Sequence, residues 1–162
     1  LAFQIYVIGD LGGRREEGIG IARAARALAR LLGDPPNTVA AIHSNLGNLY
    51  WYIGRLDDAG VEYAAALELE QKILGPEHPD VTWSWNNLGS VLLTQGRPDE
   101  AIAQFQRSLA LKPSLFEAQI NFGKALLAKG YSQADIAKLW GGNVLRVLRA
   151  GEAEAKRDLA QS

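Results

Sequence analysis

The chain has 162 residues, of which 48% are hydrophobic and 22% are charged, and its formal net charge is −1. This length and composition suit one soluble domain with a substantial core. Basic and acidic residues are both spread along the chain, so no basic patch of the kind that indicates nucleic-acid binding is present. The chain contains no cysteine, which excludes disulfides and thiolate metal sites.

The apolar stretch LAFQIYVIG (residues 1–9) opens the chain. No apolar run approaches the roughly 18 residues of a transmembrane helix, so we expect no membrane span. The stretch has neither basic residues before it nor a cleavage-like site after it, so it does not fit a signal peptide. The compartment stays open, with a cytoplasmic location favoured. Because the first residue is Leu1 rather than methionine, we expect the chain to be part of a longer protein.

The sequence repeats itself, and this repeat is its strongest signal. Residues 44–69 recur as residues 86–111, so that Gly47 of the first copy is matched to Gly89 of the second. A third, weaker copy follows at a shorter spacing, and in it Gly123 takes the place of Gly89. In each copy an asparagine stands two positions before the glycine, and these asparagines are Asn45, Asn87 and Asn121.

Each copy predicts two antiparallel helices. The first helices are expected over residues 39–53, 81–95 and 115–129. A glycine follows each of them and fits a left-handed cap, in which a Cβ would be strained. These glycines are Gly54, Gly96 and Gly130. The second helices are expected to start near Leu56 and Pro98, and Pro98 suits a first turn because its missing N–H is not needed there.

Gly47, Gly89 and Gly123 fall in the middle of predicted helices, where a glycine costs about 1 kcal/mol relative to alanine. We interpret them as the points at which the two helices of a pair touch, because a side chain there would push the helices apart. Ala59 and Ala101 are expected to be the small partners on the second helices. Close packing of each pair would then offset the helix penalty.

The spacing of these residues resembles the tetratricopeptide repeat. In the second copy the matching residues are Trp85, Leu88, Gly89, Leu92, Ala101, Phe105 and Pro113. The first copy gives His43, Leu46, Gly47, Tyr50, Ala59 and Tyr63. The 42-residue spacing, with similar loops at residues 32–39 and 74–81, resembles the kinesin light chain variety of the repeat. The resemblance implies an all-α fold of antiparallel helix-turn-helix repeats stacked in a right-handed solenoid.

On this basis the chain divides into a tetratricopeptide-repeat domain, residues 1–150, and a C-terminal capping helix, residues 141–162. The repeats are expected at residues 1–37 (truncated), 38–79 (the first full repeat), 80–113 (the second) and 114–140 (a degenerate third). In the truncated repeat, residues 15–32 are expected to be a second helix. Residues 1–12 would be the remnant of its first helix; their apolar run also fits a strand, but the repeat register favours a helix.

The third copy departs from the repeat after its first helix. The place matched to Ala101 is occupied by Asp135. The adjacent glycines Gly141 and Gly142 predict a break, because two glycines inside a helix would cost about 2 kcal/mol. Asn143 is then expected to cap a last helix.

Residues 125–150 resemble the C-terminal tail of membrane dipeptidases, which are zinc peptidases with a barrel fold. The match rests on Gly130-Tyr131-Ser132 and on Gly141-Gly142-Asn143 with Leu145-Arg146-Val147 after it. That family needs several histidine and acidic metal ligands, whereas this chain has only His43 and His78. No catalytic residue carries over, so we interpret the tail as a capping segment. A natural fusion and an artificial splice of two families both stay open.

Catalytic and metal sites are not expected. The two histidines lie far apart in the sequence, and no glycine-rich loop has phosphate-binding spacing. A metal site built from His78, Glu77 and Asp80 would lack a third strong class of ligand. The sequence therefore predicts no enzyme, no bound metal and no cofactor.

The resemblance implies that the first helices line the concave face of the solenoid. If Leu46, Gly47 and Tyr50 face the paired helix, helical phase places the recurring asparagine on the groove side, facing water. An asparagine amide both donates to and accepts from one peptide unit, and the resemblance to kinesin light chains implies that such asparagines hold cargo peptides. Trp51 and Trp83 would add apolar contacts of the kind that anchor interfaces. The predicted groove residues are Asn45, Asn48, Tyr52, Trp83, Asn87, Ser90, Asn121 and Lys124.

Two functions stay open. The first is an adaptor that binds an extended peptide or protein segment in the groove, with neither nucleic acid nor a membrane as its partner. The second is a structural spacer or self-association module of a larger multidomain protein. The truncated first repeat would expose apolar helix sides and so allow a homodimer through the repeat ends. Peptide retained on the monomer would favour the adaptor, and concentration-dependent dimerisation would favour the spacer.

Overall fold

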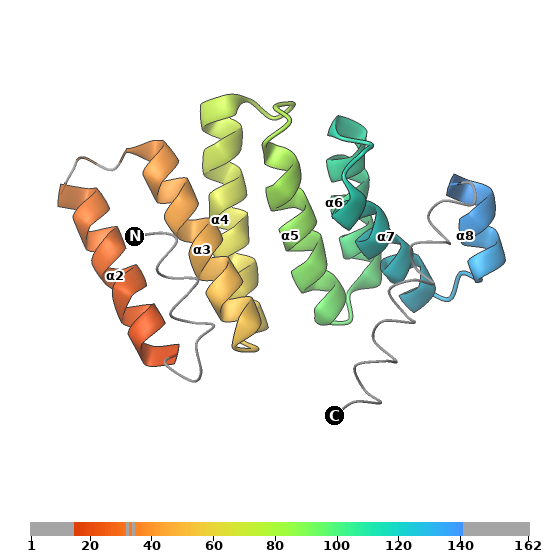
Figure 1. The fold of residues 1–162 in the computed structure, drawn as a ribbon, viewed down its shortest axis with the longest axis horizontal. Helices are drawn as coiled ribbons and strands as arrows, with labels where there is room; N and C mark the ends of the chain where they lie inside the picture. Colours follow the sequence, from red (N-terminus) through yellow and green to blue (C-terminus); the bar gives the residue numbers. More distant parts are fainter. Residues whose placement is uncertain (1–14, 32, 34, 141–162) are drawn as a thin grey trace.

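The computed structural model describes residues 15–31, 33 and 35–140, and every regular element within these residues is a helix. Figure 1 shows the helices side by side in chain order. They are α2 (Arg15–Leu31), α3 (Pro36–Tyr52), α4 (Leu56–Leu74), α5 (Val81–Thr94), α6 (Pro98–Leu111), α7 (Phe116–Ala128) and α8 (Gln133–Trp140). The predicted all-α fold is confirmed.

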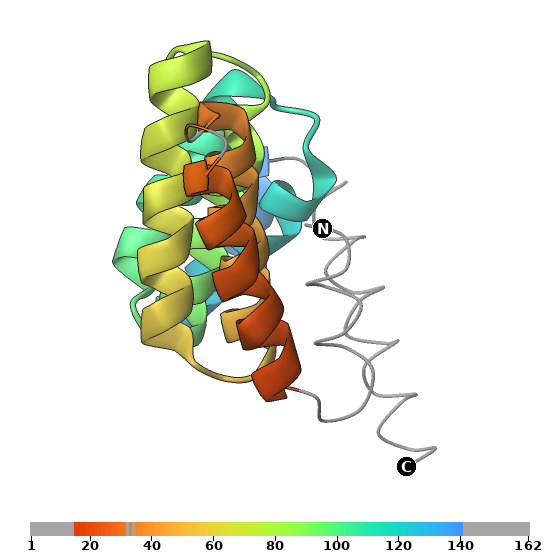
Figure 2. The ribbon, with the colours of Figure 1, turned by 90° about the vertical axis from the view of Figure 1, so that its left-hand side faces the viewer.

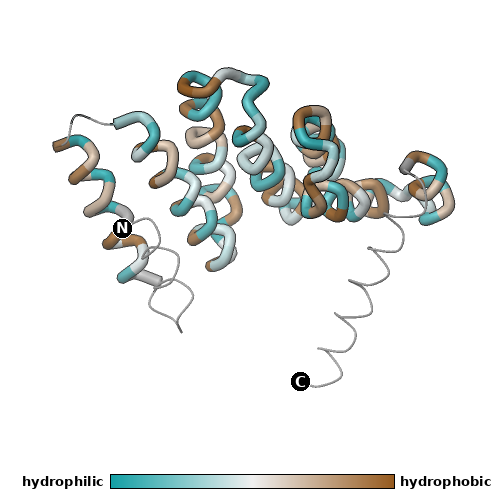
Figure 3. Tube along the Cα trace, turned by 45° about the horizontal axis from the view of Figure 1, so that its top comes forward, coloured by the Kyte–Doolittle hydropathy of each residue, from teal (hydrophilic) through white to brown (hydrophobic). Residues whose placement is uncertain are grey.

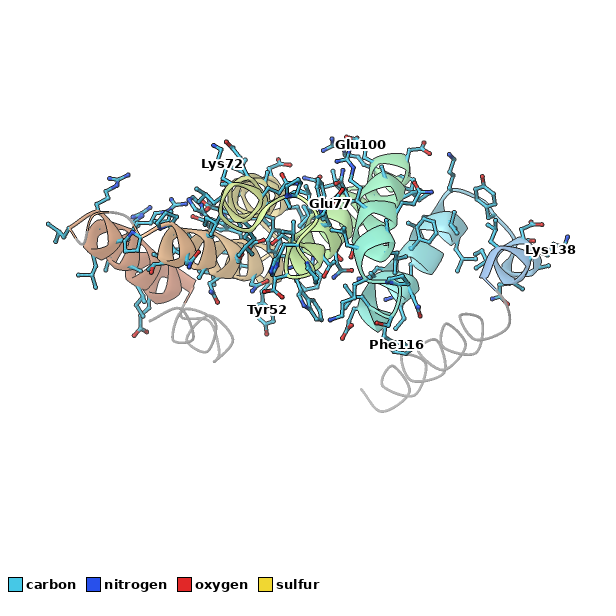
Figure 4. All side chains as sticks on the ribbon, turned by 90° about the horizontal axis from the view of Figure 1, so that it is seen from above. Tyr52, Lys72, Glu77, Glu100, Phe116 and Lys138 are labelled. Atoms are coloured by element: carbon cyan, nitrogen blue, oxygen red, sulfur yellow. The ribbon has the colours of Figure 1, made fainter. Side chains whose placement is uncertain are left out.

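The helices pack as consecutive pairs. Helix α3 packs against α4 and α5 against α6, while α4 on α5 and α6 on α7 join one pair to the next. Helix α2 packs on α3 at one end of the stack, and α8 packs on α7 at the other. Figure 2 looks along the stack from α2. In the view from above (Figure 4), α3, α5 and α7 form one layer, and α4 and α6 form the second.

The observed helix ends follow the turn residues of the sequence. Gly54, Gly96 and Gly130 have φ angles of 79°, 75° and 97°, so the predicted left-handed caps are confirmed. The main difference lies at the start of α3, which begins at Pro36 rather than at the predicted residue 39. Proline is tolerated in the first turn of a helix, because the N–H that it lacks has no intrahelical partner there.

The mid-helix glycines Gly47 and Gly89 lie where the helices of a pair touch, and the side chain nearest to each is an aromatic ring. A Cβ built on Gly47 would lie 2.6 Å from the Tyr63 ring, and one on Gly89 would lie 2.7 Å from the Phe105 ring. The nearest side chain to each glycine is therefore an aromatic ring, while Ala59 and Ala101, the expected small partners, are fully buried. A large flat ring gains more contact with bare helix backbone than a methyl group does. The helix contact of Gly123 stays a prediction.

The core runs through the stack as a chain of clusters. One lies between α2 and α3, the next joins Ala59 and Tyr63 of α4 to Val91 of α5, and a third surrounds Phe105 of α6. Figure 3 shows apolar and polar residues alternating along the helices, which is the pattern of helices with one buried face. Each pair therefore depends on its neighbours for burial, as in other solenoids.

Helix α8 follows the first helix of the third copy, in the part of the chain where the sequence departs from the repeat. It is capped reciprocally: the Asp135 N–H donates to Ser132 Oγ at 3.2 Å, and the Ser132 N–H donates to Asp135 Oδ2 at 3.3 Å. Ile136, which directly follows the place matched to Ala101, is fully buried in the Phe105 cluster. The register of the third copy is thus shifted by a single position rather than lost.

Several sequence predictions fall on residues that the structure does not describe. These are the helix remnant at residues 1–12, the break at Gly141 and Gly142, the capping helix at residues 141–162 and most of the dipeptidase-like tail. Of the helices that are described, none combines the length and the apolar character needed to cross a bilayer.

Replacing Gly89 with alanine is expected to destabilise the fold by about 1–3 kcal/mol, because the new methyl group would overlap the buried Phe105 ring. The matched control is Gly60→Ala in α4, where the new Cβ would meet only Val91 Cγ1 at an ordinary 3.7 Å. Gly60→Ala should raise stability by up to about 1 kcal/mol, because alanine is the better helix former. Urea unfolding of both variants measures the difference, and equal midpoints would contradict the ring-on-glycine contact.

Candidate functional site

A pocket of about 320 Å³ opens on the layer formed by α3, α5 and α7, with Tyr63 of α4 behind it. We call it the layer pocket. Five of the eight predicted groove residues line it, together with residues that the prediction did not include. The lining residues are Asn48, Trp51, Tyr63, Asn87, Ser90, Leu93, Thr94, Asn121 and Lys124.

The other three predicted groove residues lie outside the pocket wall. Asn45 Nδ2 donates to the Ala41 carbonyl of its own helix at 2.7 Å, so this amide is partly used within α3. Tyr52 is 58% exposed, and it projects from the α3–α5–α7 layer in Figure 4. Trp83 is 44% exposed, with the Lys112 ammonium 5.8 Å from its ring centroid.

Asn121 lines the layer pocket and also ties α7 to α5. Its Nδ2 donates to Asn86 Oδ1 and to Ser90 Oγ, both at 3.2 Å. Ser90 Oγ donates in turn to the Asn86 carbonyl at 2.9 Å, and Asn86 is only 5% exposed. The amide nitrogen of Asn121 is therefore bonded within the protein, a contact that the sequence did not predict. Asn86 precedes the repeated Asn87 and carried no signal of its own in the sequence.

Tyr63 connects the pocket to the core. Its hydroxyl donates to Asn48 Oδ1 at 2.5 Å, and the same ring covers Gly47. Burial raises the pKa of Tyr63, so the side chain stays a hydrogen-bond donor at any physiological pH. Asn48 Oδ1 is thereby occupied, whereas its Nδ2 makes no hydrogen bond within the described residues.

Asn87 is the repeated asparagine whose amide stays available. Its side chain lines the pocket, and neither its Oδ1 nor its Nδ2 forms a hydrogen bond with any residue that the structure describes. The Lys124 ammonium also has no ion pair there. The half-exposed indole of Trp51 supplies an apolar wall. The pocket thus combines unpaired donors, an unpaired acceptor and an aromatic surface.

The described residues contain no group of three or more histidine, cysteine or acidic side chains that could hold a metal ion. His78 lies in the turn before α5. Its Nδ1 accepts a hydrogen bond from the Asp80 N–H at 3.2 Å, and its own backbone N–H donates to the Gly75 carbonyl. His78 is thus a turn residue in this structure.

A charged cluster that the sequence did not reveal joins α2, α3 and α4. Glu62 is 8% exposed, and its Oε2 lies 2.5 Å from Arg26 Nη2 and 2.7 Å from His43 Nδ1. Burial pushes the pKa of Glu62 upward, but the hydrogen bond from His43 and the charge of Arg26 outweigh it and hold the pKa below the ordinary value. The sequence matches His43 to the repeat position of Trp85 and predicts no contact for its side chain.

The sequence of the chain was compared with protein families and with proteins of curated function. The family model of the tetratricopeptide repeat matches residues 38–114, slightly less than half of the chain, which span α3 to α6. No protein of curated function matches the chain in sequence.

Solved structures resemble nearly the whole chain. BtubC (BKLC) from P. vanneervenii matches with a TM-score of 0.75 and 23% identity over 94% of this chain, which spans 65% of the BtubC chain. A Podosopora anserina protein of the kinesin light chain type, with nearly identical TPR-like repeats, matches with a TM-score of 0.73 and 18% identity. That match covers 99% of this chain and 88% of the other. The fold is therefore a tetratricopeptide-type solenoid with kinesin light chain-like neighbours.

Replacing Asn121 with alanine is expected to destabilise the fold by about 1–3 kcal/mol, because the nearly buried Asn86 side-chain oxygen would lose its partner. Asn87→Ala is the matched control. It removes no hydrogen bond within the described residues, so its stability should change by less than about 0.7 kcal/mol. Thermal unfolding by circular dichroism measures both variants. An Asn121→Ala variant as stable as the control would show that the bridge contributes nothing.

The Glu62 cluster predicts a pH dependence of stability. Because the folded pKa of Glu62 lies below its ordinary value of 4.5, the carboxylate stabilises the fold above that pH, and this contribution is lost as the pH falls through the folded pKa. Glu62→Gln should therefore lower the free energy of unfolding at pH 7, and the difference from wild type should shrink in acid. Urea unfolding between pH 7 and pH 3 measures this.

Glu70→Gln is the control, because the pKa of Glu70 is shifted in the opposite direction from that of Glu62. Burial raises the pKa of Glu70, and the hydrogen bond that Ser84 donates to its Oε2 at 2.5 Å only partly offsets this. Folding therefore disfavours the ionised form of Glu70 relative to the unfolded chain. Removing that charge should not lower stability at pH 7. A constant difference between wild type and Glu62→Gln at every pH would contradict the assigned role of Glu62.

Proposed function

We propose that the layer pocket binds an extended peptide or protein segment and that the Asn87 amide holds one of its peptide units. The observation that carries this proposal is the difference among the three repeated asparagines. Asn45 and Asn121 are bonded within the protein, whereas the Asn87 amide lines the pocket unbonded. A carboxamide presents one acceptor and two donors, which match the N–H and C=O of a peptide unit.

The relation between the repeats explains why Asn87 stays unbonded. Asn121 of α7 bonds to Asn86 and Ser90 of α5, and the matching places on α3, one repeat earlier, are Ser44 and Asn48. Ser44 bonds to Glu70, and the carbonyl oxygen of the Asn48 side chain is occupied by Tyr63. Both groups at the places matched to Asn86 and Ser90 thus have other partners, and neither is hydrogen-bonded to Asn87 within the described residues, so we propose that its amide is left to a binding partner.

The charge of the pocket favours a partner with acceptor groups. Lys124 brings an unpaired ammonium, Asn48 Nδ2 adds an unpaired donor, and no carboxylate belongs to the described lining. A peptide that places a carbonyl or an acidic side chain near Lys124 would pair with both donors. A basic segment would meet only like charge there.

Aromatic side chains flank the polar pocket on two sides. Trp51 and Tyr52 stand at the C-terminal end of α3, while Trp83 and Phe116 stand near the N-terminal ends of α5 and α7. All four are exposed, and Figure 4 shows Tyr52 and Phe116 on the same side of the molecule. A segment that crosses the layer with an apolar residue at each end would bury these rings, and buried aromatics often supply most of the affinity of an interface.

The comparisons support this reading at a coarser level. Tetratricopeptide repeats are protein-interaction modules, and we propose the same non-catalytic role for this chain. A structural or self-association role is the second candidate, because apolar side chains are exposed at both ends of the described stack. Leu31 of α2 is 84% exposed and Leu139 of α8 is 61% exposed.

Selection from a random peptide-display library on the immobilised protein, followed by calorimetry of a selected peptide, tests the proposal. Asn87→Ala should weaken binding by roughly 5- to 150-fold, the equivalent of about 1–3 kcal/mol for an abandoned peptide group. Asn45→Ala is the matched control, since it alters the same repeat position outside the pocket wall. Equal affinity of Asn87→Ala and wild type would contradict the role of Asn87.

Light scattering over a range of protein concentrations separates the second candidate from the first. An adaptor is expected to stay monomeric while it binds the selected peptide. Concentration-dependent dimerisation, with no peptide recovered from the library, would instead support self-association through the repeat ends.

A further inference from the structure

A second cavity lies at the junction of α2, α3 and the C-terminal half of α4, and it shares no lining residue with the layer pocket. Its volume is about 490 Å³. We call it the junction cavity. Its wall combines apolar side chains with basic ones: Ala29, Pro36, Val39, Ile42 and Leu69, with Arg26, Arg30 and His43.

The cavity stands beside a position at which the repeats differ. His43 is matched in the next repeat by Trp85, whose larger indole is stacked by Arg107 at 4.7 Å from the ring centroid. The smaller imidazole of His43 is also drawn toward Glu62 on α4, with 2.7 Å between Nδ1 and Oε2. The first full repeat therefore has a smaller side chain at this position than the second, and Val39, Ile42 and His43 all line the cavity.

The charges of the cavity are unbalanced. Arg26 is neutralised by Glu62, whose carboxylate also fixes His43. Arg30 lies one turn after Arg26 on the same face of α2, and its guanidinium has no ion pair or hydrogen bond within the described part of the chain. None of the described lining residues is acidic. Counted over the described residues, the junction thus holds a net positive charge beside an apolar wall.

We propose that the junction cavity binds a carboxylate carried on a short aliphatic group. Arg30 pairs with the carboxylate, which suits the planar donor fork of a guanidinium, and the aliphatic part packs on Val39, Ile42 and Leu69. The volume falls in the range of about 300–1,000 Å³ that is usual for small-ligand pockets. Two sources carry this chemistry: a free medium-chain fatty acid, and the C-terminal residue of a peptide that ends in leucine.

Calorimetry with four probes tests the proposal on the whole chain. Octanoate is compared with octan-1-ol, which has the same chain without the charge, and acetyl-glycyl-leucine is compared with its C-terminal amide. At least one carboxylate should bind about tenfold or more tighter than its neutral counterpart, as expected for a charge-assisted hydrogen bond. Octanoate binding alone identifies a free acid as the source, and binding of the dipeptide alone identifies a peptide C-terminus.

Arg30→Gln should reduce the affinity for the carboxylate about tenfold and leave that for the neutral probe unchanged. Arg23→Gln is the matched control, because Arg23 is exposed on the same helix but does not line the cavity. Val39→Phe, which fills the cavity, should abolish binding of every probe. Equal binding of charged and neutral probes, equal effects of the two arginine variants, or no binding at millimolar concentration would overturn the proposal. Asn87→Ala should leave octanoate binding unchanged, so the two sites are tested independently.

Discussion

The contact of an aromatic ring with a glycine in the facing helix sets the geometry of both repeat pairs. Tyr63 lies on Gly47, and Phe105 lies on Gly89. Because glycine has no Cβ, the ring rests directly on helix backbone, and the two helices of a pair approach as closely as that ring allows. The helix penalty of a mid-helix glycine is about 1 kcal/mol, which is small beside the burial of a whole ring.

The same contact also explains why the layer pocket is not repeated identically. Tyr63 carries a hydroxyl and Phe105 does not, and that hydroxyl takes the side-chain carbonyl oxygen of Asn48. At the matching place in the second pair, Ser90 keeps its oxygen for Asn121 of the next helix. The two repeats thus differ in how these places are used: Asn121 is bonded to Ser90, whereas Asn87 has no hydrogen bond to Asn48 within the described residues.

Much of the fold could be predicted because it depends on spacing. The glycine caps, the helix pairs and five residues of the layer pocket all follow from the repeat and from helical phase. Contacts between side chains that are distant in the sequence cannot be predicted from spacing. Arg26 and Glu62, for example, are 36 positions apart, and neither stands out in the sequence. The start of α8, in contrast, could have been predicted. Ser132 and Asp135 have the spacing of a capping box, but the repeat comparison did not consider it.

In this chain the pair interfaces and the junctions between pairs have separate physical roles. Within a pair, Tyr63 and Phe105 are buried against glycine, so substitutions there are expressed mainly as stability. At the junction of α2 with the first full pair, Glu62 of α4 contacts both His43 of α3 and Arg26 of α2. The place matched to His43 in the next pair holds Trp85, which is stacked by Arg107 of its own pair. Such a solenoid keeps its fold while its junction side chains vary, because each pair retains its own ring-on-glycine contact. Binding sites are therefore expected at junctions, where substitution changes the shape and charge of a cavity without separating the helices of a pair.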